Sequence, residues 1–157
     1  MIKFNKASIT QLEEKYLLDA LHGNVLSGDG KYTDLAYEEL DKRFGFERML
    51  LTTSGTASLE MASILSRIEP GDEVIVPSFT FSSTVNAFLL RGAHPVFCDI
   101  RPDTCNIDEM LIEELITPKT KAICAVDYAG VAAEMDTINR IAKEHGLMVI
   151  EDASQAL

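Results

Sequence analysis

The chain alternates between short apolar runs and longer stretches in which apolar residues recur at helical spacing. The apolar runs are continuous and do not alternate with polar residues, which is typical of strands that are buried on both faces. They predict strands at residues 48–53, 72–77, 94–100, 121–127 and 147–152. The stretches between them predict helices at residues 55–68, 82–92, 108–116 and 134–146. This succession predicts an α/β fold with a mostly parallel sheet and helices on both faces.

Two more helices are predicted ahead of the first strand. Thr10 and Glu13 form a T-x-x-E capping box, and apolar residues follow at helical spacing until Gly23. After a glycine-containing loop, a second helix is expected from about residue 34 to 44, closed by Gly45 as the C′ residue. We therefore expect residues 1–30 to form an N-terminal helix and loop, and residues 31–157 to form the domain built on the sheet.

Composition narrows the classes of partner. The chain has 157 residues, 46% of them hydrophobic, which suits one α/β domain with its own core. A net charge of −11 opposes binding to nucleic acid or to an anionic membrane, although backbone N–H groups can still hold a small phosphate. With no signal-like N-terminus and no long apolar span, we expect a cytoplasmic protein. The three cysteines lack metal-site spacing and are interpreted as reduced packing residues, so no metal site is expected.

Candidate chemistry is expected at the carboxyl ends of the strands, where ligands of open α/β sheets bind. Four stretches follow predicted strands and carry polar or aromatic residues. They are residues 54–58, 77–82, 127–130 and 152–155.

The first stretch, "TTSGTASLE", places small and hydroxyl residues where a strand meets a helix. Gly55 and Thr56 let a ligand approach the unpaired N–H groups of the first helical turn, and the helix N-terminus attracts negative charge, so a phosphate fits here. The alternative is that Ser54 or Thr56 only caps the helix. There is no G-x-G-x-x-G and no Walker lysine, which counts against a dinucleotide or nucleoside triphosphate.

Two further stretches supply an aromatic face and an acid. Phe79 and Phe81 follow the strand at 72–77, where one of them can face a flat heterocycle; alternatively, both belong to the core. Asp152 ends an apolar strand, and a buried carboxylate there needs a cationic or hydrogen-bonding partner. That partner is either a protonated ligand nitrogen, with Gln155 donating to a neighbouring oxygen, or the N-terminus of a following helix that Asp152 caps.

Together, a phosphate cradle, an aromatic face and a carboxylate suit one planar, phosphorylated and cationic heterocycle. Pyridoxal 5'-phosphate has these features, because its ring withdraws electrons only while the pyridine nitrogen is protonated and a buried Asp keeps it so.

The same segments carry a family resemblance. "SGTASLEMA", "GDEVIVPSFTFSSTVNAFLLRGAHPVFCDIRPDT", "DYAGVAAEMD" and "VIEDASQA" resemble, in this order, the DegT-type nucleotide-sugar aminotransferases, which are pyridoxal-phosphate enzymes of fold type I. Within that family, residues 101–123 and 127–138 are most similar to the aminotransferases that act on TDP-4-keto-6-deoxy-glucose in enterobacterial surface-polysaccharide synthesis. The resemblance implies that residues 31–157 are part of the large, cofactor-binding domain.

The resemblance also implies roles for individual residues. Gly55 and Thr56 would hold the cofactor phosphate, Phe81 would stack on the ring, Asp152 would pair with the pyridine nitrogen and Gln155 would bond the phenolic oxygen. In such enzymes L-glutamate donates the amino group, a keto sugar nucleotide accepts it, and a homodimer completes each site.

The family's Schiff-base lysine follows the Asp-x-x-Gln segment, and no lysine of this chain matches its position. We therefore expect the 157 residues to be an incomplete domain that does not transaminate alone. The family sheet has two later strands beside the one at residues 48–53, which would lose its neighbours here. Expressed alone, the chain is expected to aggregate through unpaired strand edges.

Three other interpretations stay open. A dehydratase of the same family carries His in place of the lysine. A flavodoxin-like or receiver-like signalling domain has similar length but needs an acidic cluster after its first strand, where "RMLLTTSG" has none. A scaffold that binds the cofactor without turnover is the third.

Overall fold

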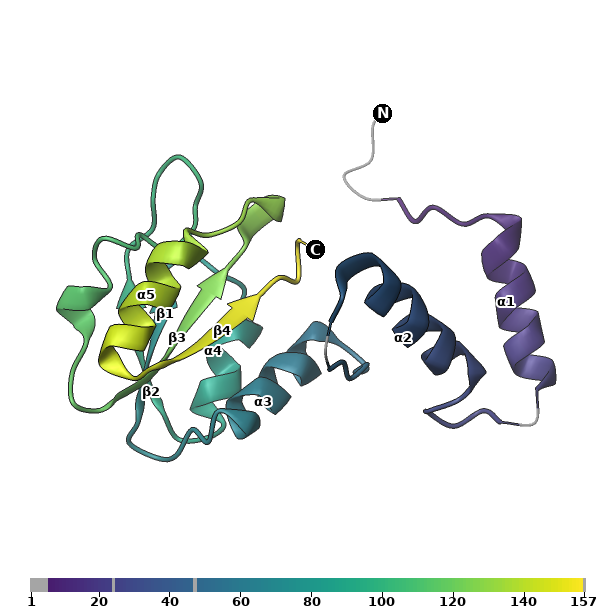
Figure 1. The fold of residues 1–157 in the computed structure, drawn as a ribbon, viewed down its shortest axis with the longest axis horizontal. Helices are drawn as coiled ribbons and strands as arrows, with labels where there is room; N and C mark the ends of the chain where they lie inside the picture. Colours follow the sequence, from purple (N-terminus) through teal and green to yellow (C-terminus); the bar gives the residue numbers. More distant parts are fainter. Residues whose placement is uncertain (1–5, 24, 47, 157) are drawn as a thin grey trace. The chain divides into compact units, whose positions relative to one another are not determined.

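The computed structural model describes residues 6–23, 25–46 and 48–156 (Figure 1). The chain divides into two compact units, with the boundary between Leu51 and Thr52. The predicted boundary after residue 30 was drawn from the sequence pattern alone and stays a prediction.

The first unit contains two helices, α1 (Gln11–His22) and α2 (Lys31–Phe44). The predicted capping box at α1 is confirmed: the Thr10 hydroxyl accepts from the Leu12 N–H at 3.2 Å, and the Thr10 N–H donates to Glu13 at 2.6 Å. Helix α2 begins ahead of the predicted residue 34. It ends as predicted at Gly45, whose φ of 64° is the left-handed conformation that glycine adopts without strain.

The second unit is built on a parallel sheet of four strands, β1 (Glu73–Pro77), β2 (His94–Cys98), β3 (Thr120–Val126) and β4 (Met148–Asp152). Their order is β2-β1-β3-β4, and every pairing is parallel. Residues directly opposite one another include Ile75 and Ile123 in the centre of the sheet, and Val126 and Asp152 at its carboxyl edge. The predicted fold class, α/β with a parallel sheet, is confirmed.

Helices cover both faces of this sheet, as the continuous apolar runs predicted (Figure 1). Helices α3 (Gly55–Leu65) and α4 (Ser82–Leu89) pack on one face, where Phe88 shares a core with Val74, Val76 and Cys124. Helix α5 (Met135–His145) packs on the other face. The central strands β1 and β3 therefore send alternate residues into two separate cores, which excludes water from both sides of the sheet at its centre.

Two predicted elements are wrong. Residues 48–53 contain no strand, because no other described segment pairs with them and a strand exists only through its ladder. Residues 108–116 form turns and one 3₁₀ turn, Glu113–Leu115, in place of an α-helix. Here the Asp108 carboxylate accepts from the Met110 N–H at 3.1 Å, which favours a turn over a helix.

No helix in the described part of the chain combines the length and the apolar character that crossing a membrane requires.

The parallel order brings the carboxyl ends of β1, β3 and β4 to one edge of the sheet. The loops after these strands and the N-termini of α3 and α4 meet there. This edge is where ligands of open α/β sheets bind.

Candidate functional site

A cavity of about 260 Å³ lies at the carboxyl edge of the sheet. All four stretches singled out in the sequence contribute to its walls. The lining residues are Thr56, Thr80, Phe81, Ser83, Val126, Tyr128, Asp152, Ser154 and Gln155.

Asp152 is the acid of this cavity. It ends β4, and its relative exposure to solvent is only 6%. One carboxylate oxygen accepts from the Thr84 hydroxyl at 2.7 Å, and the other accepts from the Ser154 hydroxyl at 2.6 Å and the Ser154 N–H at 3.2 Å. These donors fix the direction of the carboxylate but are neutral, so they leave its negative charge uncompensated.

The hydrogen bond from the Ser154 N–H bears on the alternative that Asp152 caps a following helix. Asp152 accepts a backbone hydrogen bond two residues ahead, as in an Asx turn. Residues 153–156 form a turn and not a helix, so within the described residues Asp152 caps no helix.

The N-terminus of α3 forms another wall. Ser54 is the N-cap, with its hydroxyl accepting from the Ala57 N–H at 3.1 Å, so the capping alternative is correct for Ser54. Thr56 lines the cavity. Gly55 lies beside it, close enough that a Cβ atom would approach the Ser154 hydroxyl to 3.1 Å. The first turn of α3 has no acidic residue, so its positive end stays available to an anion.

Aromatic side chains lie at the mouth of the cavity and not in the core. Phe81, the N-cap residue of α4, is 74% exposed and lines the cavity. Phe79 is also exposed and packs against Tyr128, with ring centroids 4.9 Å apart. The alternative that both phenylalanines belong to the core is therefore wrong. A flat ligand can use the open face of Phe81.

Gln155 closes the cavity from the loop after β4. Its side-chain oxygen accepts from the Ala129 N–H at 2.7 Å. An N–H group can only donate, so this bond identifies the oxygen and leaves the NH₂ group of Gln155 as a donor for a ligand acceptor.

The structure thus gathers Thr56, Phe81, Asp152 and Gln155 around one cavity, with Gly55 next to it. Sequence reasoning did not single out Thr84 and Ser154, which hold the Asp152 carboxylate. Thr84 is fully buried in α4, and a hydroxyl residue in the apolar face of a predicted helix was the signal that could have identified it.

Two groups near the cavity, Cys124 and Glu151, have shifted pKa values. Burial, together with the nearby Asp152 carboxylate, raises the pKa of the Cys124 thiol, so this cysteine is an unreactive packing residue. Partial burial and the neighbouring Asp127 carboxylate raise the pKa of Glu151. Asp127 is buried and accepts from the Ala133 N–H at 2.9 Å, which gives it a structural role in the loop after β3. No cluster of metal-binding side chains occurs among the described residues.

The two ends of the cavity favour opposite charges. The buried Asp152 carboxylate favours a cation or a protonated ring nitrogen, while the N-terminus of α3 favours an anion. Between them lie an aromatic face and an amide donor. The site therefore suits a small planar ligand with an anionic group at one end and a proton-bearing nitrogen at the other.

The close approach of Gly55 to Ser154 gives a testable coupling. We expect Gly55→Ala to displace the Ser154 hydroxyl by a few tenths of an ångström and to weaken its bond to the Asp152 carboxylate, because the new methyl group would lie 3.1 Å from that hydroxyl. In a Ser154→Ala background the same substitution meets no hydroxyl. The free energies of unfolding of the four proteins, from urea titrations, should give a coupling of about 1 kcal/mol. Additive effects would show that Gly55 and Ser154 do not press on each other.

Comparisons with known proteins identify the family of this chain. The model of the DegT/DnrJ/EryC1/StrS aminotransferase family matches residues 7–157. GDP-perosamine synthase of Caulobacter vibrioides is 38% identical over 149 residues, which cover 92% of this chain and 39% of that protein. The UDP-2-acetamido-2-deoxy-3-oxo-D-glucuronate aminotransferase of Pseudomonas aeruginosa is 38% identical over 162 residues, which cover 99% of this chain and 45% of that protein. The chain thus spans less than half the length of these relatives.

Among solved structures, NtdA from Bacillus subtilis, with its bound cofactor PMP, superposes with a TM-score of 0.86 and 37% identity. The match covers 95% of this chain and 35% of that one.

Proposed function

Because the chain belongs to the DegT/DnrJ/EryC1/StrS aminotransferase family, we propose that its cavity binds pyridoxal 5'-phosphate as part of a sugar aminotransferase. The reaction moves an amino group from L-glutamate to a keto sugar nucleotide, with dTDP-4-keto-6-deoxy-D-glucose as the acceptor that the sequence resemblance suggests. The family membership replaces the alternative of a flavodoxin-like or receiver-like domain. The observation that carries the proposal is a buried, uncompensated Asp152 carboxylate in a cavity that also reaches the N-terminus of α3.

The residues of the cavity fit this cofactor. When bound, pyridoxal phosphate supplies a ring that withdraws electrons from the amino-bearing carbon. Asp152 keeps the proton on the ring nitrogen, because a carboxylate in a site of low polarity strongly favours a neighbouring cation. Thr84 and Ser154 keep the carboxylate pointed in one direction, so no reorganisation is needed when the ligand enters.

The remaining residues hold and orient the ligand. Thr56 and Gly55 offer the N–H groups of the first turn of α3 to the phosphate. Phe81 covers one face of the cofactor ring. Its own aromatic face is available for this contact, because the Phe81 side chain is exposed in this chain. Gln155 donates its NH₂ group to the phenolic oxygen, since its own oxygen is already bonded to Ala129.

No lysine occurs among the described residues that line this cavity. We propose that the chain by itself binds the cofactor without a covalent bond and without turnover, and that a homodimer completes the site of the parent enzyme. The proposal agrees with the expectation from the sequence, in which no lysine matches the Schiff-base position of the family.

Pyridoxamine phosphate tests the proposal, because its amine cannot form an imine with surface lysines. Titration followed by its fluorescence should show saturable binding to one site per chain, displaced by millimolar inorganic phosphate. Absence of binding would contradict the proposed cofactor site. Separately, sustained release of 2-oxoglutarate from glutamate and the keto sugar nucleotide would contradict the proposal that this chain does not turn over.

A further inference from the structure

The loop Tyr128–Val131 begins at Tyr128, which lines the cavity, and it holds an unfavourable backbone conformation. Ala129 has φ 54° and Gly130 has φ 81°, so two consecutive residues are left-handed, one of them not a glycine. This conformation aims the Ala129 N–H at the Gln155 side chain. A left-handed alanine persists only when surrounding contacts hold it, so these contacts decide whether Gln155 stays oriented.

Asn106 supplies those contacts from outside the cavity. It is fully buried, and its amide spans the two ends of the loop. The side-chain oxygen accepts from the Tyr128 N–H at 2.9 Å, and the side-chain NH₂ donates to the Val131 carbonyl at 2.8 Å. Both functions of the amide are therefore used on the backbone of this one loop.

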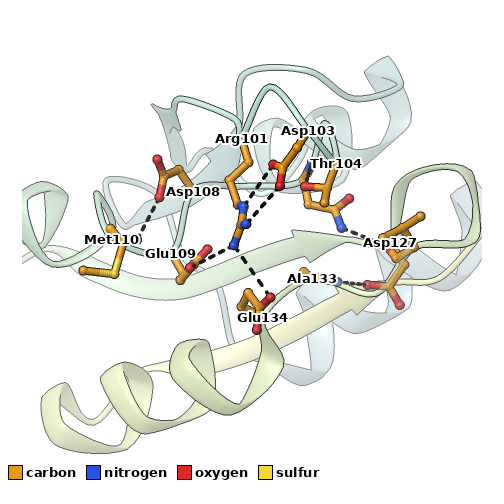
Figure 2. Close-up of polar contacts among 11 residues, drawn as sticks. Arg101, Asp103, Thr104, Asp108, Glu109, Met110, Asp127, Ala133 and Glu134 are labelled. Atoms are coloured by element: carbon orange, nitrogen blue, oxygen red, sulfur yellow. Dashed lines mark hydrogen bonds and ion pairs between the residues drawn. The ribbon is translucent and has the colours of Figure 1, made fainter.

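Asn106 itself is held in a hairpin-like turn between β2 and β3. Ile100 and Ile107 form an antiparallel bridge, and the Arg101 N–H donates to the Asn106 carbonyl at 2.8 Å. The same turn reaches the far end of the 127–134 segment through Arg101, whose guanidinium lies 3.6 Å from Glu134 (Figure 2). The Asp127 carboxylate bonds the Ala133 N–H on that segment, so the loop is anchored at several points (Figure 2).

We propose that Asn106 is a positioning residue of the cofactor site. Its two hydrogen bonds hold the loop Tyr128–Val131 in place, and this fixes the direction of the Ala129 N–H. The Ala129 N–H then keeps the side-chain oxygen of Gln155 occupied, so that the NH₂ group of Gln155 is directed to the ligand. This inference rests on the proposed function for the ligand that Gln155 meets. The brace itself is a property of the protein alone.

Two readouts test the proposal on the whole chain. In Asn106→Ala, hydrogen exchange of the Ala129 amide should become at least about 10-fold faster relative to the amide of Ile123 in the sheet, because the loop loses both bonds at once. Pyridoxamine phosphate should bind about 10-fold more weakly. The control is Ile112→Val, which trims a fully buried residue of the α5-side core and should change each readout by less than about two-fold.

A double-mutant cycle separates positioning from general loosening. If Asn106 acts through Gln155, Asn106→Ala should weaken pyridoxamine phosphate binding little further in a Gln155→Ala background. Full additivity would overturn the proposal, as would unchanged exchange at Ala129. If Asn106→Ala does not fold, Asn106→Asp serves instead, since it keeps the acceptor for Tyr128 and removes the donor to Val131. Failure of the wild-type chain to bind the probe would contradict the proposed function, while the exchange readout still decides on the brace.

Discussion

Replacing Asp152 by asparagine should weaken the binding of pyridoxamine phosphate by about 30-fold or more. The substitution keeps the shape of the side chain but removes the charge that holds a proton on the ring nitrogen. Loss of a charge partner in a buried, hydrogen-bonded pair costs about 2–5 kcal/mol, and each 1.4 kcal/mol is a factor of about ten in affinity. Fluorescence titration of the two proteins at equal pH measures the difference.

Without ligand, the Asp152→Asn chain should be at least as stable as the unsubstituted chain. The Asp152 carboxylate is buried with neutral partners, so its charge is desolvated without a compensating cation from the described residues. A neutral amide at this position would not carry this cost, although one of its hydrogen bonds has to reverse.

The control for this prediction is Asp99→Asn, which removes an exposed acid just after β2. It should leave affinity within about two-fold. If the Asp152→Asn chain bound pyridoxamine phosphate as tightly as the unsubstituted chain, the Asp152 carboxylate would have no part in the site.

Replacing Phe88 by alanine should lower the free energy of unfolding by about 3–5 kcal/mol. Phe88 is fully buried between α4 and the sheet, and no larger side chain among the described residues is fully buried. Its removal leaves a cavity against β1 and β3 that rigid strands cannot close. Urea unfolding followed by circular dichroism measures the loss.

Leu90→Ala is the matched comparison, because Leu90 follows the same helix but is 70% exposed. It should cost less than about 1 kcal/mol. Equal losses for the two substitutions would show that α4 is not docked on the sheet through Phe88.

Local signals predicted the elements that depend on local physics. The capping box at Thr10 and the terminating glycine Gly45 work through hydrogen bonds and backbone angles within a few residues. The four strands of the sheet could also be predicted, because a short continuous apolar run between turn residues is typical of a buried strand. The rule that ligands bind at the carboxyl edge of such sheets then predicts that the stretches with Thr56, Phe81, Asp152 and Gln155 lie near one another, and in the structure these residues line one cavity.

What could not be predicted depends on partners far away in the sequence. The apolar run at residues 48–53 has the pattern of a strand. A strand forms only when it pairs with a neighbour, and none of the described segments pairs with this run. The run at residues 108–116 has helical spacing, yet the Asp108 side chain and the path to β3 favour turns. Asn106 carries no signal in the sequence, because its function lies in bonds to a loop that begins 22 residues later.

The hydrogen bond between Thr84 and Asp152 joins residues that are 68 positions apart, which has a consequence for folding during synthesis. A ribosome releases α3, α4, β1 and β3 well before β4, so an emerging chain can already assemble most of its sheet while the binding cavity has no acid and no closing amide. Ligand capture then reports that β4 has docked. A ligand that binds only the completed cavity would favour the docked chain by mass action.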